Sequence, residues 1–172
     1  IGSTKLLVSN MGAAGRGYFA MDVTSPRGLS ESGVASKAMW EFPAANDATM
    51  KSKVGQTLGK ASIVRNSANE WVVLVTSGYN NTFDGKGRLW VLNATTGAVI
   101  AEYTNNTGST SAESGLAHVS PFAESDGTVK YVYGGDLLGN VWRFDLSSYS
   151  EGDFKVEKFA ELKSTDASAQ SV

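Results

Sequence analysis

Three segments of the chain share an alternation of apolar and polar residues that ends in an acidic or amide side chain. They cover residues 17–24, 88–95 and 140–147. The shared terminal residues are Asp22, Asn93 and Asp145. A large aromatic residue stands at the same position before each of them: Phe19, Trp90 and Trp142. Alternation of this kind indicates β-strands with two unlike faces, and a repeat on this scale predicts an array of similar structural units.

Each repeated segment is flanked by further segments that resemble strands. More continuous apolar runs precede it, at residues 5–9, 71–76 and 130–133. Hairpins that contain glycine join the two strands, at residues 11–17, 77–87 and 134–139. Half-polar strands follow, at residues 37–42, 98–103 and 154–159. The second and third units also have a leading strand, at residues 58–64 and 115–120.

A unit of four antiparallel strands with short turns is typical of a β-propeller blade. No window of the sequence has a sustained helical period with caps at its ends, so we expect less than about 10% helix, against roughly a third in an average globular protein. The predicted fold class is therefore all-β. It is a partial, quinoprotein-like β-propeller whose blades have four antiparallel strands, with little or no helix.

The repeat also predicts the domain organisation. A partial propeller is expected over residues 1–162, and a polar linker or tail over residues 163–172. The blades are an incomplete first one at 1–45, a second at 56–106 and a third at 114–162. Because closed propellers have about four to eight blades, the chain has the pattern of part of a ring. Its uncovered blade faces predict self-association.

Composition narrows the classes of function. The 172 residues carry a net charge of −2 without a basic run, which argues against nucleic-acid binding and against a polybasic membrane patch. The chain has no cysteine, so disulfides, zinc–thiolate sites, iron–sulfur clusters and a cysteine nucleophile are excluded. No apolar run approaches the roughly 20 residues of a membrane-spanning helix.

Three stretches resemble one family of proteins when they are taken together, in order and spacing, over about residues 5 to 160. They are residues 134–146 (GGDLLGNVWRFDL), residues 15–24 (GRGYFAMDVT), and residues 77–80 (SGYN) followed by 89–97 (LWVLNATTG). The pattern resembles the C-terminal β-propeller of the type IV pilus biogenesis and adhesin proteins, the PilC/PilY family. The family's N-terminal adhesive region is not expected in this chain.

The resemblance implies a non-catalytic module of a surface protein. Members are exported through the periplasm to the outer membrane, the cell surface or the pilus tip, where they help pili extend against retraction and mediate adhesion to host cells. Expected partners are pilus subunits, a host-cell receptor, or both. Two alternatives remain open: a fragment of a quinoprotein dehydrogenase, which binds pyrroloquinoline quinone with calcium, and a scaffold propeller for outer-membrane protein assembly. The absence of cysteine weighs against the enzyme.

The resemblance also raises the question of a calcium site. The family carries a loop of the type D-x-D-x-D-G-x-x-D before a Tyr-Val-Tyr strand. The corresponding residues here are 122–130, where only Glu124, Asp126 and Gly127 keep the pattern. Phe122 stands at the first ligand position, and Lys130 stands where the closing acid belongs. Since calcium needs six to eight oxygen ligands, we expect no metal and no other cofactor here, and a plain turn at Asp126–Gly127.

A weaker cation candidate is the polar hairpin around Asn80, Asn81 and Asp84. The simpler interpretation is a turn whose asparagine side chains bind the local backbone. The same argument predicts that Asp22, Asn93 and Asp145 accept hydrogen bonds from backbone amides in the turns that follow them.

The remaining residues of interest have structural interpretations. His118 is the only histidine, and we expect it to be a structural residue on an apolar strand. The tryptophans are expected in the blade core, where each buries a large apolar area; they are Trp40, Trp71, Trp90 and Trp142.

Overall fold

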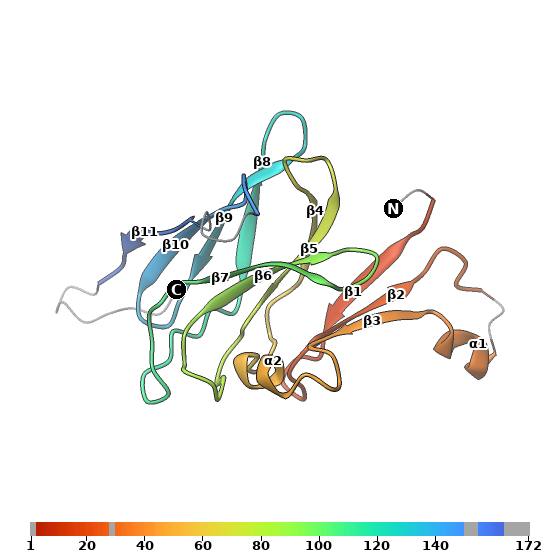
Figure 1. Ribbon diagram of the computed structural model, residues 1–172, viewed down its shortest axis with the longest axis horizontal. Helices are drawn as coiled ribbons and strands as arrows, with labels where there is room; N and C mark the ends of the chain where they lie inside the picture. The colour runs from red at the N-terminus through yellow and green to blue at the C-terminus, as the bar shows by residue number, and fades with distance from the viewer. Residues whose placement is uncertain (1–2, 28–29, 150–154, 164–172) are drawn as a thin grey trace.

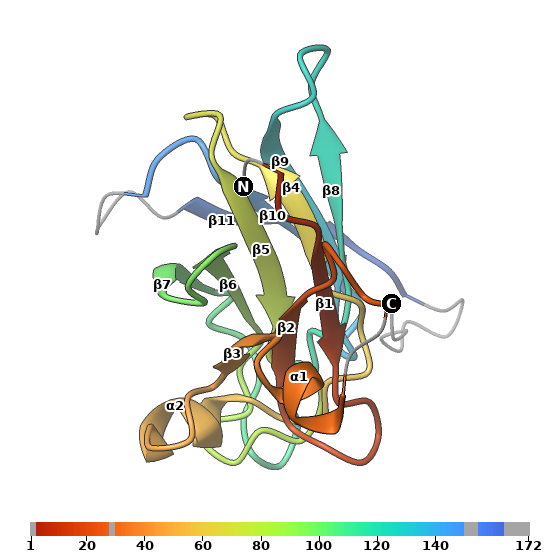
Figure 2. The ribbon, with the colours of Figure 1, turned by 90° about the vertical axis from the view of Figure 1, so that its right-hand side faces the viewer.

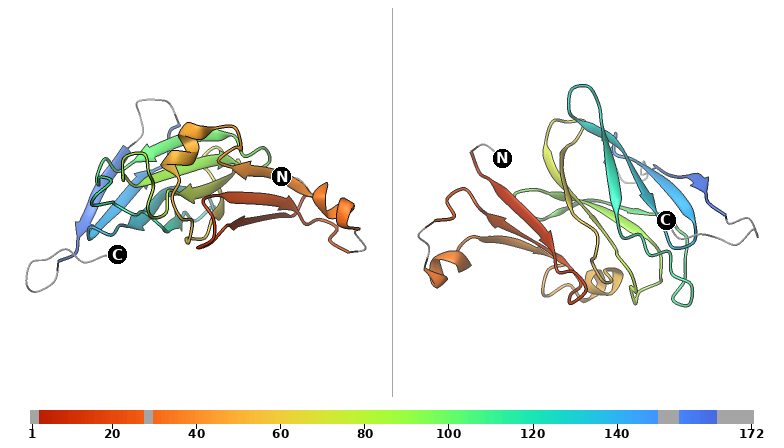
Figure 3. Two further views of the ribbon diagram at one scale, coloured as in Figure 1. Left: turned by 90° about the horizontal axis from the view of Figure 1, so that it is seen from below. Right: turned by 180° about the vertical axis from the view of Figure 1, so that it is seen from behind.

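The computed structural model describes residues 3–27, 30–149 and 155–163. Within these ranges the chain forms three antiparallel β-sheets in chain order, with two short helices beside them. The sheets spread from one another like the blades of a fan (Figure 1). Figure 2 looks onto the fan from the N-terminal sheet, and Figure 3 shows from below how the red, green and blue sheets succeed one another.

The strand bounds are as follows. Sheet 1 contains β1 (Leu6–Asn10), β2 (Tyr18–Asp22) and β3 (Ala38–Phe42). Sheet 2 contains β4 (Ser62–Arg65), β5 (Trp71–Thr76), β6 (Arg88–Asn93) and β7 (Val99–Thr104). Sheet 3 contains β8 (Val119–Ala123), β9 (Val129–Gly135), β10 (Asn140–Asp145) and β11 (Lys155–Glu161). In every sheet, neighbours in sequence are neighbours in space.

The strand register confirms that the repeated segments are equivalent. Phe19, Trp90 and Trp142 each lie on the strand that forms the second hairpin arm, opposite Ser9, Val75 and Gly134 respectively. Asp22, Asn93 and Asp145 end these strands opposite Leu6, Val72 and Tyr131. The three sheets are thus copies of one pattern, and the fold is part of a β-propeller, as predicted.

Apolar side chains hold the sheets together at two junctions. At the first junction, Tyr18, Ala20, Trp40 and Phe42 of sheet 1 meet Val73, Val75, Trp90 and Leu92 of sheet 2. At the second, Leu74, Val91, Ala101 and Tyr103 of sheet 2 meet Val119, Val132, Trp142 and Phe144 of sheet 3. Alternation along each strand sends odd and even positions to opposite faces, so the middle sheet contributes one face to each junction.

Two helices have 5 and 6 residues, so the expected helical content of less than about a tenth is confirmed. They are α1 (Glu31–Ala35) and α2 (Ala48–Lys53). Local capping explains why each helix begins where it does. The Ser30 side chain accepts a hydrogen bond from the Gly33 amide, and the Asp47 side chain accepts one from the Met50 amide. Neither helix is predicted from the sequence, because a helix of five or six residues is too short to show the apolar periodicity of an amphipathic helix. No helix among the described residues is long and apolar enough to span a membrane.

Two leading strands begin later than predicted, because the residues before them contact the neighbouring sheet instead of pairing. Strand β8 begins at Val119 rather than at residue 115. Before it, Leu116 is fully buried and its carbonyl accepts from the Gly78 amide of sheet 2's hairpin. Strand β4 likewise begins at Ser62. A side chain at Gly59 would overlap the Ala117 carbonyl, so glycine permits this close approach.

The prediction that all four tryptophans lie in the core is wrong for Trp71. Trp40, Trp90 and Trp142 are buried, but Trp71 is 43% exposed. It opens β5 and pairs with Arg65 on β4. Its ring centre lies 6.0 Å from the Arg65 guanidinium carbon. At this end of β5 the neighbouring sheet no longer covers the Trp71 ring, so the ring contacts the Arg65 guanidinium instead of apolar side chains.

The hairpins between the second and third strands of each unit line one rim of the fan, and polar bonds join the sheets along it. The Thr57 hydroxyl donates to the Gly17 carbonyl at 2.8 Å. The Tyr18 hydroxyl donates to the Thr76 carbonyl at 3.2 Å, and the Thr76 hydroxyl donates to the Ala117 carbonyl at 2.8 Å. All three sheets are therefore linked at this rim, which we call the hairpin rim.

Among the described residues, the opposite rim, formed by the turns before and after these strands, has fewer such links. The Trp40 indole donates to the Ala94 carbonyl at 3.0 Å, and Arg65 donates to the Asp126 carbonyl at 2.8 Å. Gly97 makes the first contact possible, because a side chain there would overlap the Trp40 ring. Of the tail predicted at residues 163–172, residues 164–172 lie outside the described residues.

Candidate functional site

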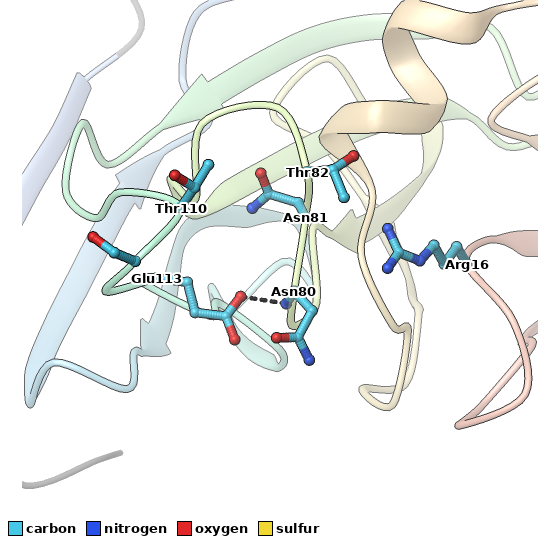
Figure 4. Close-up of a pocket in the computed structure, with 7 residues that line it drawn as sticks. Arg16, Asn80, Asn81, Thr82, Thr110 and Glu113 are labelled. Atoms are coloured by element: carbon cyan, nitrogen blue, oxygen red, sulfur yellow. Dashed lines mark hydrogen bonds between the residues drawn. The ribbon is translucent and has the colours of Figure 1, made fainter.

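A polar cavity of about 510 Å³ opens at the hairpin rim between sheets 1 and 2 (Figure 4). Arg16 reaches it from the β1–β2 hairpin, and residues 80–82 reach it from the β5–β6 hairpin. The loop between β7 and β8 completes the lining with Thr110, Ser111 and Glu113. The lining contains amides, hydroxyls, one guanidinium and one carboxylate, so the cavity offers hydrogen-bonding groups beside the aliphatic parts of the same side chains.

One hydrogen bond joins two of the residues that line this cavity. Glu113 accepts a hydrogen bond from the Asn80 amide, drawn as a dashed line in Figure 4. Asn80 adopts a positive φ of 58°, which asparagine tolerates better than most residues. Its side-chain amide points toward Gln56, at 3.5 Å. The bond between the Asn80 amide and Glu113 joins the β5–β6 hairpin to the loop after β7.

The residues of the weaker cation candidate form a turn; they are Asn80, Asn81 and Asp84. The Asn81 side chain accepts from the Gly85 amide at 3.0 Å and donates to the Lys86 carbonyl at 3.1 Å. Both oxygens of Asp84 accept from Arg88, each at 2.7 Å. The prediction that the asparagines bind the local backbone is confirmed for Asn81, and Asp84 is paired with a guanidinium.

Arg88 is buried and joins this hairpin to α2 through a cluster of charges. It contacts Asp84 at 2.7 Å and Glu102 at 3.1 Å, and Lys53 of α2 contacts Glu102 at 2.9 Å. The hydrogen bond from Arg88 holds the pKa of Asp84 below its ordinary value. Burial acts to raise the pKa of Glu102, but Lys53, Trp90 and Arg88 together outweigh it, so the net pKa is lowered. The cluster is charge-balanced and internally bonded, which is the arrangement of a structural ion pair network.

The calcium-type loop is also a turn. The Glu124 amide donates to the Thr128 carbonyl at 2.7 Å, and Gly127 adopts a φ of 79°. Asp126 accepts from the amide and hydroxyl of Thr128, at 2.9 and 2.7 Å. These bonds from Thr128 lower the pKa of Asp126. The turn predicted at Asp126–Gly127 is present, and it joins β8 to β9.

We expect this loop to bind no calcium at about micromolar concentration. Two carboxylates supply too few oxygens for a tight site, and Lys130 adds a positive charge. Titration calorimetry should show no heat that depends on Asp126. Binding that Asp126→Ala abolishes would contradict this, whereas binding that survives the substitution would move attention to residues 80–84. Within the described part of the chain, no group of three or more histidine, aspartate and glutamate side chains is placed to hold a metal ion.

Three predicted turn contacts are confirmed. Asp22 accepts from the Thr24 amide at 2.8 Å, and Asp145 accepts from the Ser147 amide at 2.9 Å. Asn93 accepts from the amides of Thr95 and Thr96, both at 3.0 Å. These side chains end their strands and start the turn to the next strand.

The interpretation of His118 is wrong in its placement. His118 is exposed and precedes β8 instead of lying on an apolar strand. The flanking residues Ala117 and Val119 are the buried ones. Two smaller hollows, of about 300 and 390 Å³, share His118 and Tyr79 in their lining.

A buried polar network around Asp136 was not predicted. Asp136 is fully buried in the β9–β10 hairpin. One oxygen accepts from the amides of Leu138 and Asn140, at 3.0 and 2.8 Å. The other accepts from the Trp142 indole at 2.8 Å and from the Ser114 hydroxyl at 3.1 Å. Asp136 therefore orders its own hairpin, orients a core tryptophan and binds the loop that leads into β8.

Comparison with known proteins supports one family. A family model described as the PilY1 beta-propeller domain matches residues 3–171. The type IV pilus biogenesis factor PilY1 homolog of Xylella fastidiosa (strain Temecula1) is 38% identical over 151 residues, which are 83% of this chain and 10% of that protein. The type IV pilus biogenesis factor PilY1 of Pseudomonas aeruginosa (strain UCBPP-PA14) is 33% identical over 153 residues, which are 86% of this chain and 12% of that protein.

A solved structure agrees with these sequence matches. The crystal structure of the Pseudomonas aeruginosa PilY1 C-terminal domain superposes with a TM-score of 0.78 at 26% identity, covering 97% of this chain and 36% of that one. The chain spans about a tenth of the length of the curated relatives it matches. From the match over residues 3–171 and the identity to curated members, the chain belongs to the PilY1 β-propeller domain family.

Proposed function

We propose that the chain is a non-catalytic β-propeller module of a surface protein that acts in type IV pilus biogenesis, in the control of pilus retraction and in host-cell adhesion. The observation that carries the proposal is the identity of 33–38% to proteins named as type IV pilus biogenesis factors. On this proposal the parent polypeptide is exported through the periplasm to the outer membrane, the cell surface or the pilus tip. Its partners are pilus subunits, a host-cell receptor, or both.

The chemistry of the described residues supports a binding or scaffolding role over catalysis. The charges of the Arg88 cluster at the hairpin rim are paired with one another, and Asp136 accepts from several structural donors. The matched relatives are named as pilus factors and do not favour the quinoprotein alternative. Incubation with pyrroloquinoline quinone and calcium should accordingly give no bound quinone absorbance.

The test is carried out in the bacterium that encodes the parent polypeptide. Asp136→Ala, which removes the buried network of the third sheet, is compared with Asp126→Ala in an exposed turn. We expect Asp136→Ala to reduce surface pili when the retraction motor is present, and pili to return when the motor is deleted. Adhesion is then measured in the strain without the motor, at equal piliation, and is expected to fall.

Two outcomes would contradict the proposal. Normal piliation and normal adhesion, with a module shown by proteolysis to be unfolded, would remove both roles. Loss of pili that persists without the retraction motor would place the module in assembly and not in the control of retraction.

A further inference from the structure

The polar cavity at the hairpin rim contains several groups that the fold itself does not use. Among the described residues, no acid contacts the Arg16 guanidinium, and no hydrogen bond engages the hydroxyls of Thr82 and Thr110. Glu113 accepts from the Asn80 amide with one carboxylate oxygen, and its other oxygen meets no donor in the same part of the chain. A hollow in which unused polar groups converge has the character of a binding site.

The walls of this cavity are held in place by hydrogen bonds to the rest of the fold. Each of the three segments that form the lining has at least one such bond. They run from the Thr82 amide to the Ser52 carbonyl at 3.0 Å, from the Gly17 amide to the Thr57 hydroxyl at 3.2 Å, and from the Ser109 amide to the Ala112 carbonyl at 3.0 Å. Because the walls are fixed in advance, a ligand loses little of its binding energy to ordering them.

The lining matches a ligand that carries many hydroxyl groups. Five of its seven residues are neutral and bear an amide or a hydroxyl; they are Asn80, Asn81, Thr82, Thr110 and Ser111. Ligand hydroxyls both donate and accept, so they can pair with such groups and with the unused oxygen of Glu113. None of the seven is an aromatic or aliphatic residue, so the cavity lacks the apolar pocket into which a peptide side chain would anchor.

Arg16 adds a preference for an acidic ligand. Its side chain extends from the β1–β2 hairpin toward Asn80 and Thr82 (Figure 4). A guanidinium can bind a carboxylate through two parallel, charge-assisted hydrogen bonds. Glu113 belongs to a different segment, the loop after β7, so a ligand can place its carboxylate at Arg16 and its hydroxyls at Glu113. The volume of about 510 Å³ lies within the range of small-molecule sites.

We propose that this cavity binds an acidic saccharide, that is, a sugar with a carboxylate beside its hydroxyls. Arg16 binds the carboxylate, and Thr82, Thr110 and the unused oxygen of Glu113 bind hydroxyls. The side chain of Asn81 is committed to the β5–β6 turn and serves as scaffold. The inference rests on the cavity and not on the proposed role in pili. Binding is measured on the purified protein, so a failure there leaves the role in pili untouched.

The first test compares glucuronic acid with glucose, which differ only in the carboxylate, by saturation-transfer NMR titration of the full-length parent polypeptide. We expect glucuronic acid to bind about tenfold more tightly, because a charge-assisted pair with Arg16 is stronger than a neutral hydrogen bond. Arg16→Gln should bring glucuronic acid to the level of glucose. The matched control is Arg27→Gln, in the exposed loop after β2, which should preserve the preference. Absence of saturable binding, or a preference that survives Arg16→Gln, would overturn the proposal.

A second set of variants tests the recognition of hydroxyls. Thr82→Val and Thr110→Val remove one hydroxyl each at nearly constant shape, and each should weaken both sugars by about threefold, the effect of one neutral hydrogen bond. Both threonines are exposed, so Tm should stay within about 2 °C of the wild-type value. Unchanged affinity in both variants would contradict the proposal.

Glu113→Gln distinguishes a saccharide from the end of a peptide chain. Glutamine keeps an acceptor oxygen for the Asn80 amide and for a ligand hydroxyl, so the affinity for glucuronic acid should fall by less than about threefold. A ligand with an ammonium group would instead lose its counter-charge and about tenfold or more in affinity. Glycylglycine, which carries both charges, is the competing probe. Displacement of glucuronic acid by a lower concentration of glycylglycine, abolished by Glu113→Gln, would assign the cavity to a peptide terminus and overturn the proposal.

Discussion

Replacing Asp136 with alanine is expected to lower the free energy of unfolding by about 3 to 5 kcal/mol, because the substitution leaves several buried donors without an acceptor. The donors are the backbone amides of Leu138 and Asn140, the side-chain amide of Asn140, the Trp142 indole and the Ser114 hydroxyl. Each unsatisfied buried polar group costs about 1 to 3 kcal/mol, and the losses within one network do not add fully. Urea denaturation followed by circular dichroism measures the change.

The matched control for this substitution is Asp126→Ala. Asp126 also starts a turn and also accepts from the residue two positions later, through the amide and the hydroxyl of Thr128, but it is exposed. Water can replace those bonds, so we expect a loss below about 1 kcal/mol. Equal losses for the two variants would mean that the buried network adds nothing beyond an ordinary turn. Asp136→Asn should fall between them, since the amide keeps one acceptor oxygen.

Trp90→Ala is expected to cost about 3 to 5 kcal/mol, whereas Trp71→Ala should cost less than about 1 kcal/mol. Trp90 is fully buried at the first junction, with its ring centre 5.2 Å from that of Phe42. Trp71 is 43% exposed beside Arg65. Removing Trp90 leaves a cavity between two sheets, whereas removing Trp71 uncovers a strand end.

Circular dichroism in urea is suited to both variants, because fluorescence would change with the removed chromophore. A comparable loss for Trp71→Ala would indicate that the strand end is covered in the folded parent polypeptide. In that case the exposed fraction of Trp71 in this chain would not describe its environment there.

The parts of the fold that could be predicted are those in which one local pattern decides the outcome. Strand β5 was predicted at residues 71–76 and β6 from residue 88, and both are observed there. Alternation determines which side chains share a face, and Asn93, the last residue of β6, accepts the hydrogen bonds that start the turn. The same logic extended correctly to the turns after Asp22 and Asp145.

What could not be predicted depends on contacts between units. The apolar run at residues 115–120 predicts a strand. Leu116 and Ala117 are instead buried against the neighbouring sheet, so strand β8 begins only at Val119. Trp71 is a large aromatic residue of the kind that usually lies in a core, but it is exposed because sheet 1 does not extend over it.

For the candidate site, the turn at Asp126 was predictable because its hydrogen bonds are local. Arg16 and Glu113 meet at one cavity only after the sheets are assembled.

Asp136 illustrates a signal that was present in the sequence but not used. It opens a hairpin of the form Asp-Leu-Leu-Gly-Asn, and an aspartate in that position commonly binds backbone amides two to four residues ahead. Those local bonds are observed with Leu138 and Asn140. Its burial and its bonds to Ser114 and Trp142 belong to the tertiary structure and have no counterpart in the local pattern.

The uneven distribution of polar bonds between the two rims has a mechanical consequence. Along the hairpin rim, Thr57, Tyr18 and Thr76 join all three sheets through buried hydrogen bonds, whereas fewer such bonds join the described residues of the opposite rim. A load that pulls adjacent sheets apart would therefore be resisted mainly at the hairpin rim, and separation would begin at the other. The three sheets would stay joined at the hairpin rim while they separate at the opposite rim. The force needed to separate them therefore depends on the direction of pull as well as on the overall stability of the fold.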